Sequence, residues 1–507
     1  MIFNKLHVIL FLLYVPFFSF SQVQECTGNL AGGIYPCNDY DLMAFMPISE
    51  LSNGAKASDI WGWTDPLNGN EYAIACYRNS TAFVNITDPI NPIFMGRLNT
   101  NSNSSVWRDV KIYNNYAFII ADNVGAHGMQ VFDLKRLRTE TSVNNTYTAD
   151  SVYTGVGSCH NIVINESEAI AYLVGCTSTN GGGPIFIDLS QFSPGATATN
   201  PTATYINDYT IGGYSHDAQV VTYIGPDKDY YDPANGITGK QIYIGSNGNT
   251  DKVVILDVTD KNNVIAINSF TYTQTEYAHQ GWFTEDQKYF ILGDEVDEIT
   301  HGFNTKTLIF DFTDLDIDFD NTANSGLTRT YFGPEKAIDH NGYVKGNKFF
   351  LANYRAGMRV LDISNIDNTA MNPMTEIGYF DTYPADNNVN YNGTWSIYPY
   401  FTSGNIIIND IEQGLFIVRK SNTLKTPKFT KNSNFSLSPN PAKDYFIIKS
   451  NNTNLINTIF IYDLLGQLIY KSEKLKTTSK KINTSNMPEG IYLIKINNQH
   501  TKKLIVN

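Results

Sequence analysis

The stretch DHNGYVKGNKFFLANYRAGMRVLD, residues 339–362, decides the fold. Three short runs with strand-like composition lie within it and a fourth follows: Gly342–Val344, Phe349–Asn353, Gly357–Asp362 and Thr375–Phe380. The turn residues Gly346 and Asn347 separate the first two runs, as in a β-hairpin. Runs of this length and spacing predict four consecutive antiparallel strands.

The same pattern recurs seven times along the chain. One run of each repeat ends in an apolar triplet with Asp, or in a degenerate copy: Phe83-Val84-Asn85, Val131-Phe132-Asp133, Phe186-Ile187-Asp188, Ile255-Leu256-Asp257, Ile309-Phe310-Asp311, Val360-Leu361-Asp362 and Phe416-Ile417-Val418. A second marker precedes each triplet: Ser58-Asp59, Arg108-Asp109, His160-Asn161, His216-Asp217, His279-Gln280, His340-Asn341 and Thr394-Trp395. Successive markers lie 50 to 63 residues apart, a period typical of four-stranded propeller blades.

The seventh repeat has only three strand-like runs, which end at Val418. The segment Leu42–Ile48 precedes the first repeat and is a candidate for the missing strand. Its pairing with the last run would close the ring and remove an exposed sheet edge. We therefore expect an all-β fold in which residues 22–419 form a seven-bladed β-propeller.

Both ends of the chain differ from the repeats. Residues 1–21 contain Lys5, an apolar stretch and the small residues of a cleavage site, which predicts a signal peptide. Residues 420–433 are polar and are expected to be a linker. Residues 434–507 again contain strand-like runs, and their pattern predicts a small β-sandwich.

Charge is divided unevenly between these parts. The whole chain carries −13, whereas residues 420–507 contain 14 Lys, no Arg and four acids, which gives +10 and leaves −23 for residues 1–419. Nucleic-acid binding depends on Lys and Arg at phosphates, so we do not expect a nucleic-acid partner for this acidic body. No segment of the mature chain has the length and apolarity of a transmembrane helix.

Five cysteines in an exported chain point to disulfides. Cys159 and Cys176 flank a predicted hairpin and would face each other across it. Cys26 and Cys37 would close a small N-terminal loop and leave Cys76 free. A Cys37–Cys76 pair is the alternative.

The tail closely resembles the type A C-terminal sorting domain of the type IX secretion system of Bacteroidetes. The motifs that carry the resemblance are Pro-Asn-Pro at 439–441, Asp-Leu-Leu-Gly at 463–466, Gly-Ile-Tyr-Leu-Ile at 490–494 and Lys-Lys-Leu-Ile-Val at 502–506. The resemblance implies that the type IX machinery engages residues 434–507, and that the body ends up secreted or on the outer cell surface.

Residues 26–419 resemble the choice-of-anchor B family, whose members carry LVIVD-type propeller repeats. The resemblance is carried by several segments, among them Ile60-Trp61-Gly62-Trp63-Thr64, His127-Gly128-Met129-Gln130-Val131, His279-Gln280-Gly281-Trp282 and Asn353-Tyr354-Arg355-Ala356-Gly357. It implies a fold and a location but no reaction.

The marker residues are the candidate functional site. In a propeller the first strand of each blade lines the central channel, so the second markers should meet at one channel mouth. The candidates for ligand or metal binding are Arg108, His160, His216, His279, His340, Asp217 and Asp294. The predicted hairpin register places Asp294 opposite Gln280. The alternative is that these histidines are structural and complete a buried hydrogen-bond network once per blade.

Alternating acids form a second candidate, a calcium site at Asp314, Asp316, Asp318 and Asp320. This segment lacks the Gly and the distal Glu of an EF-hand loop. A divalent cation, either Ca²⁺ or a transition metal, is thus a candidate cofactor. A solvated acidic loop is the alternative.

We found no motif for a catalytic nucleophile, a phosphate loop or a zinc protease. The sequence therefore favours an extracellular binding module over an enzyme, with a glycan, a peptide or a small anion as ligand. The alternative is a metal-assisted hydrolase or lyase that acts on an extracellular polymer at the channel mouth.

Overall fold

The computed structural model describes residues 22–317, 329–421, 435–451, 454–463, 467–497 and 500–507. The predicted signal peptide, most of the predicted linker, Asp318, Asp320 and residues 464–466 of the tail motif lie outside the described residues. The chain divides into two compact units, residues 1–421 and 422–507. Strands dominate the secondary structure, so the prediction of an all-β protein is confirmed.

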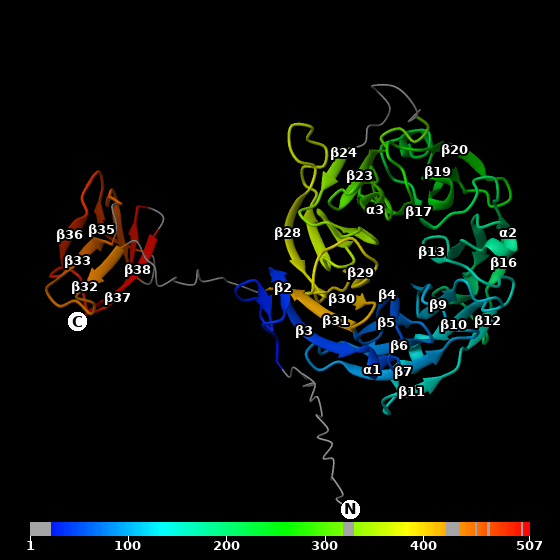
Figure 1. The fold of residues 1–507 in the computed structure, drawn as a ribbon, viewed down its shortest axis with the longest axis horizontal. Helices are drawn as coiled ribbons and strands as arrows, with labels where there is room; N and C mark the ends of the chain where they lie inside the picture. Colours follow the sequence, from blue (N-terminus) through cyan, green and yellow to red (C-terminus); the bar gives the residue numbers. More distant parts are fainter. Residues whose placement is uncertain (1–21, 318–328, 422–434, 452–453, 464–466, 498–499) are drawn as a thin grey trace, which may run out of the picture. The chain divides into compact units, whose positions relative to one another are not determined.

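The described residues of the first unit form seven sheets, which follow one another around a ring in Figure 1 and are antiparallel apart from one edge strand. In each sheet the strands are given from the ring centre outward. The first sheet contains β4 (Ala57–Thr64), β5 (Glu71–Tyr77), β6 (Ser80–Asn85) and β7 (Ile93–Asn99), and the second contains β8 (Arg108–Tyr113), β9 (Tyr116–Ala121), β10 (Met129–Asp133) and β12 (Ser151–Tyr153). The third contains β13 (Asn161–Asn165), β14 (Ile170–Val174), β15 (Ile185–Asp188) and β16 (Thr204–Asp208). A short strand, β11 (Asn145–Tyr147), pairs parallel with the outer edge of β7.

The next three sheets repeat this order. Their strands are β17 (Asp217–Thr222), β18 (Gln241–Asn247), β19 (Lys252–Asp257), β20 (Ile265–Phe270); β21 (Ala278–Phe283), β22 (Tyr289–Asp294), β23 (Lys306–Asp311), β24 (Arg329–Phe332); and β25 (Gly342–Lys345), β26 (Lys348–Ala352), β27 (Met358–Asp362), β28 (Thr375–Phe380). On the outer edge of β28 lie β2 (Tyr35–Asn38) and then β1 (Leu30–Ala31).

The seventh sheet joins the two ends of the body. It consists of β29 (Thr394–Tyr398), β30 (Asn405–Asp410), β31 (Gly414–Lys420) and the N-terminal strand β3 (Tyr40–Pro47). β3 pairs antiparallel with β31, with Tyr40 opposite Lys420 and Pro47 opposite Gly414. The segment expected to supply the missing strand does so, and Lys420 belongs to this sheet rather than to the linker.

The inner strands complete the ring. Each of β4, β8, β13, β17, β21, β25 and β29 contacts its neighbours, and β29 contacts β4. Apolar side chains of adjacent sheets fill the space between them; Phe83 of one sheet stacks on Phe132 of the next at 4.2 Å between ring centroids. Each sheet therefore buries its faces against its neighbours.

Helical segments are short in the described parts of the chain. The α-helices are α1 (Ile48–Leu51), α2 (Thr177–Asn180) and α3 (Asp297–His301). The 3₁₀ helices are η1 (Leu134–Arg138), η2 (Ser190–Phe192), η3 (Pro233–Asn235) and η4 (Gly248–Thr250). Within the residues that the structure describes, none of these helices is long and apolar enough to cross a membrane.

Two disulfides lie in the body. Cys26 bonds to Cys37, the first of the two N-terminal alternatives, and Cys159 bonds to Cys176. Cys76 is a free and buried thiol. The first disulfide ties the N-terminal loop to β2, and the second crosses the entry to the third sheet.

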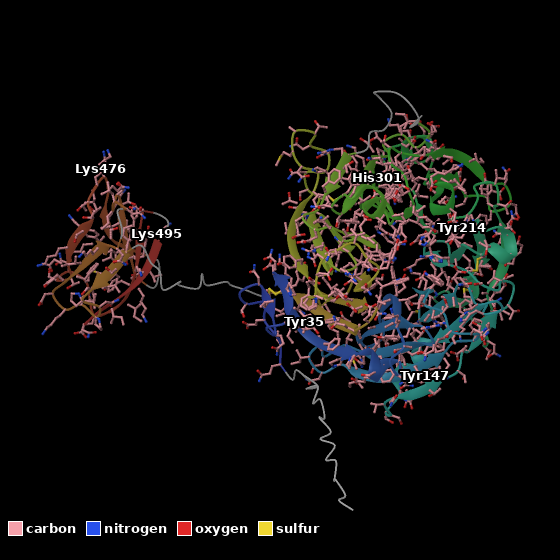
Figure 2. The ribbon with its side chains drawn as sticks, in the orientation of Figure 1. Tyr35, Tyr147, Tyr214, His301, Lys476 and Lys495 are labelled. Atoms are coloured by element: carbon pink, nitrogen blue, oxygen red, sulfur yellow. A yellow bond between two sulfur atoms is a disulfide. The ribbon has the colours of Figure 1, made fainter. Side chains whose placement is uncertain are left out.

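The second unit has two sheets around one apolar core. The first sheet contains β32 (Phe435–Ser438), β33 (Tyr445–Ser450) and β36 (Ser479–Asn483). The other contains β34 (Ile459–Tyr462), β35 (Leu468–Ser472), β37 (Gly490–Ile496) and β38 (His500–Val506). Lysines lie on its outside, such as Lys476 and Lys495, which are labelled in Figure 2.

Candidate functional site

Four histidines at one repeat position lie next to one another. His160, His216 and His340 precede the inner strands of their sheets, and His279 is the second residue of β21. The ring centroids are 4.1 Å apart for His160–His216, 4.3 Å for His216–His279 and 4.3 Å for His279–His340. We call these four residues the histidine arc. Sequence reasoning placed them at one channel mouth, and the structure brings them together.

Hydrogen bonds to the next sheet fix the orientation of two of these rings. Nδ1 of His216 lies 3.2 Å from the carbonyl oxygen of His279, and Nδ1 of His340 lies 2.5 Å from that of Trp395. A carbonyl only accepts, so Nδ1 is the donor in both rings. In the neutral imidazole Nε2 then carries a lone pair.

The other two rings, those of His160 and His279, differ from these. Nδ1 of His160 lies 2.9 Å from a carboxylate oxygen of Asp122. Nδ1 of His279 is buried and makes no hydrogen bond of normal geometry to a described residue, although the backbone of His340 lies near enough to favour the protonated ring. The arc is therefore only partly accounted for by hydrogen bonds that hold the sheets together.

Burial keeps the inner histidines neutral. It lowers the pKa of His216 and His279 well below the usual value, and the neighbouring imidazoles lower both further. Burial also lowers the pKa of His340, to about 3, although its bond to the Trp395 carbonyl acts in the other direction. At neutral pH these rings therefore offer lone pairs and no positive charge.

Glu295 faces the arc from the loop after β22. One of its carboxylate oxygens lies 3.7 Å from Nε2 of His279 and the other lies 3.7 Å from Nε2 of His340. The hydroxyl of Tyr354 donates a 2.6 Å hydrogen bond to the same carboxylate. Burial raises the pKa of Glu295 to about 7, although the bond from Tyr354 opposes this shift.

These groups line a cavity of about 390 Å³, which is within the size range of small-molecule sites. Its wall comprises the histidine arc with Lys56, Ala57, Val106, Trp107, Glu295, Tyr354, Tyr391, Trp395 and Ile411. Two aromatic side chains stand open at its rim, since Trp107 is 40% exposed and Tyr391 is 44% exposed. The amine of Lys56 lies 3.2 Å from the carboxylate of Glu412.

A second depression adjoins this cavity. It measures about 610 Å³ and shares with the cavity Trp107, His160, His216 and Glu295. Asp122, Ser158, Tyr214 and Tyr277 extend its lining, and Tyr214 is labelled in Figure 2. The cavity therefore has room for a ligand that continues past the histidine arc.

Three of the sequence-predicted residues do not line the cavity. Arg108 shares the repeat position of the histidines, but its long side chain turns away and is buried. Its guanidinium donates a 2.8 Å bond to Oγ1 of Thr100 and lies 3.3 Å from Nε2 of His127. It holds neighbouring sheets together and does not line the cavity, although it borders a smaller pocket together with the four histidines.

Asp217 lies deeper in the ring. Its carboxylate accepts the backbone N–H of Ala218 at 2.6 Å. Burial raises its pKa well above the usual value, and the charge of Lys111 opposes this shift. Lys111 in turn lies 2.7 Å from Asp109 and 3.9 Å from Asp59. Asp217 thus belongs to a buried charge cluster below the cavity.

Asp294 was expected opposite Gln280, and the structure places it opposite Ala278. A register shift between Ala278 and Gln280 causes the difference. The Asp294 carboxylate accepts the Tyr272 hydroxyl at 2.8 Å and the backbone N–H groups of Glu276 and Tyr277 at 2.9 and 2.8 Å. It anchors the loop that presents its neighbour Glu295.

The acidic segment near residue 314 is only partly described. Carboxylate oxygens of Asp314, Asp316 and Asp227 lie within 4.8 Å of one another, and Asp314 and Asp316 are exposed. Asp227 was absent from the sequence-based candidates. One of its oxygens already accepts the backbone N–H of Leu315 at 2.8 Å.

The other cavity residues were not among the predicted site residues. Glu295 directly follows β22 and Tyr354 lies two residues after the end of β26, and these are the second strands of adjacent sheets. The second strand of each sheet returns to the rim where the histidines start the first strand. This rule could have placed Glu295 and Tyr354 at the same rim as the histidines from the sequence alone.

Comparison with known proteins identifies a family for the second unit. Residues 436–507 match the family of secretion system C-terminal sorting domains, which supports the predicted type IX sorting tail. Such a tail indicates export to the cell surface or beyond it. The chain is also 43% identical over 72 residues to an endo-acting ulvan lyase of Formosa agariphila, a match that covers 13% of this chain and 14% of the lyase.

Solved structures resemble the body only distantly. A protein from Lactobacillus plantarum has a TM-score of 0.42 and 11% identity, with 84% of this chain and 99% of that chain covered. A functionally unknown protein from Desulfotomaculum acetoxidans has a TM-score of 0.39 and 12% identity, with 64% and 90% covered. Likenesses at this level assign no function.

Proposed function

We propose that the chain is an exported seven-bladed β-propeller that binds an extracellular carbohydrate at the histidine-lined cavity. The seven sheets and their contacting inner strands support the propeller. The sorting tail supports the export. The body is the binding module, and the tail carries it to the outside.

One observation favours a carbohydrate among the ligand classes that the sequence left open: the wall of the cavity is rich in acceptors. The fixed tautomers of His216 and His340 leave lone pairs on Nε2, and Glu295 adds a carboxylate. An anion brings only acceptors, whereas Lys56, the cation among the described residues that line the cavity, already pairs with Glu412. A polyol brings many hydroxyl donors and fits such a wall.

The aromatic residues at the rim of the cavity also favour a carbohydrate ligand. Trp107 and Tyr391 present open aromatic faces, on which the apolar face of a sugar ring can stack while its hydroxyls reach inward. The adjoining depression gives room for further sugar units of a chain. A terminal or internal unit of an oligosaccharide is therefore the ligand that we propose.

The test is binding of the purified full chain to a panel of neutral and acidic oligosaccharides, followed by titration calorimetry. Trp107→Ala and Tyr391→Ala should each weaken binding by about 1 kcal/mol, or roughly fivefold to tenfold, as expected for loss of one aromatic contact. Tyr205→Ala is the matched control, because Tyr205 is 47% exposed on the outer strand β16. Preferential binding of acidic peptides or of free anions, unaffected by the two rim variants, would refute the proposal.

A hydrolase or lyase is the second candidate, since a carboxylate lies next to two imidazoles in a cavity. These are residue types that serve in acid–base chemistry. Incubation of the same oligosaccharides with the chain, followed by an assay for new reducing ends or unsaturated products, tests it. Binding without any cleavage assigns the cavity to recognition alone.

A further inference from the structure

We propose that His279, His340 and Glu295 bind one divalent first-row transition-metal ion at the base of the cavity. Each residue offers one ligand atom, and the three atoms lie within 4.8 Å of one another. All three side chains line the cavity, so a bound ion would keep a coordination position open to it.

The contacts between these atoms are not hydrogen bonds. Both Nε2–carboxylate distances are 3.7 Å, which is longer than an N–H···O bond. The tautomer of His340 also excludes a hydrogen bond from its Nε2 to Glu295, because Nδ1 donates to a carbonyl and Nε2 is left as an acceptor. An acceptor nitrogen that faces a carboxylate oxygen in a buried place requires a cation or a proton between them.

The spacing is suitable for coordination. Ligands bound tetrahedrally at about 2.1 Å from zinc lie about 3.4 Å from one another. Each Nε2 lies 3.7 Å from a different oxygen of Glu295, a few tenths of an ångström more than this value. One ligand atom from each residue can be chosen so that all three lie within 4.8 Å of one another, and small side-chain rotations would bring them to coordination distance. The site is thus close to the geometry that a metal would require.

Hydrogen bonds behind the ligands support the assignment. The carbonyl of Trp395 holds the ring of His340, and the hydroxyl of Tyr354 holds the carboxylate of Glu295. Ligands of metal sites are commonly oriented by such partners. Here they fix two of the three ligands before any ion arrives.

The ligand set selects the class of metal. Two imidazole nitrogens and one carboxylate are typical of Zn²⁺, Fe²⁺, Mn²⁺ and their neighbours. Calcium takes six to eight oxygen ligands and does not suit this set.

The experiment uses the full chain without affinity tag, stripped with EDTA and titrated with Zn²⁺ by calorimetry in the absence of any sugar. We expect one equivalent to bind. Glu295→Gln keeps the size of the side chain and an acceptor for Tyr354. It should weaken Zn²⁺ binding by more than the roughly 10–100-fold that loss of a partner behind a ligand causes.

Glu276→Gln is the matched control, because Glu276 also lies beside a histidine, with 2.9 Å between its carboxylate and Nε2 of His301. It should leave the Zn²⁺ affinity unchanged. No binding to the stripped, folded chain, or equal binding by the Glu295→Gln and Glu276→Gln variants, would overturn the proposal.

X-ray absorption of the zinc-loaded wild-type chain provides a test that needs no variant. Two imidazole ligands are expected around the ion, and a coordination sphere without imidazole would refute the site. Trp107→Ala leaves all three ligands in place and should bind Zn²⁺ like the wild type. Failure of carbohydrate binding and failure of metal binding are therefore distinguishable.

Discussion

The hydroxyl of Tyr354 donates a 2.6 Å hydrogen bond to Oε1 of Glu295, and this bond joins two adjacent sheets across the cavity. Tyr354 follows β26, whereas Glu295 follows β22, and the ring of Tyr354 lies 4.7 Å from that of His340. One side chain thus supports both the carboxylate and one imidazole of the proposed metal site.

Tyr354→Phe should lower Zn²⁺ affinity by roughly 10–100-fold while the chain stays folded. The substitution removes the hydroxyl but keeps the buried ring, so the packing against His340 persists. Calorimetric titration measures the affinity, and circular dichroism verifies the fold. An unchanged affinity would show that Glu295 needs no support or that it does not bind the ion.

A buried acid should make the stability of the body depend on pH. Burial raises the pKa of Asp410 from 3.8 to about 7, although the Thr382 hydroxyl and backbone N–H groups favour its charged form. Folding therefore takes up a proton between about pH 4 and pH 7. The free energy of unfolding should fall as the pH rises through this window and level off above it.

Asp410→Asn should remove the part of this dependence that Asp410 contributes, because the amide keeps an acceptor oxygen and does not ionise. Other buried acids, such as Glu295, keep their own contributions in both proteins. Relative to the wild type the variant should gain stability with rising pH, by at most about 4 kcal/mol. Urea unfolding from pH 4 to pH 8 is the measurement. The exposed Asp88→Asn controls for the loss of one negative charge, and parallel curves for all three proteins would contradict the prediction.

Closure of the ring depends on β3, so truncation of its buried side chain Leu42 should lower the free energy of unfolding strongly. Leu42 is fully buried and packs in the cluster that contains Phe416 and Val418 of β31. Leu42→Ala should reduce the free energy of unfolding by about 2–5 kcal/mol. Leu67→Ala, at a side chain that is 74% exposed, should change it by less than about 0.5 kcal/mol. Equal urea midpoints for the two variants would argue against a closing role.

The thiol of Cys76 should be inert in the folded protein. The side chain is fully buried, and burial raises its pKa to about 12, although nearby Arg108 opposes the shift. The other four cysteines form disulfides. A thiol reagent should therefore detect no thiol in the native chain and one after unfolding in guanidinium without a reductant. Detection of a thiol before unfolding would contradict this prediction.

The repeat pattern predicted most of the body because alternation and turn residues are local. The runs expected at Gly342–Val344 and Phe349–Asn353 correspond to β25 and β26 within one residue at each end. The clustering of the histidines followed from their shared repeat position alone. Both inferences needed only the period of the sequence.

The rest of the site depends on features that the period does not reveal. The register shift between Ala278 and Gln280 places Asp294 opposite Ala278. Asp294 therefore anchors the loop, and its neighbour Glu295 faces the cavity instead. Arg108 occupies the repeat position of the histidines, yet a longer side chain let it reach Thr100 instead. Bulges and side-chain directions depend on tertiary packing, which no repeat pattern encodes.

The pairing of β3 with β31 also determines how the body responds to force. The two strands are antiparallel and Tyr40 lies opposite Lys420, so the chain enters and leaves the ring at the same end of the pair. Tension that reaches this end would peel the two strands apart one hydrogen bond at a time, since those bonds lie across the strands. β2 lies N-terminal to β3 and pairs with β28 of the sixth sheet, so a pull on both ends would detach β2 from that sheet before it opens the ring at β3.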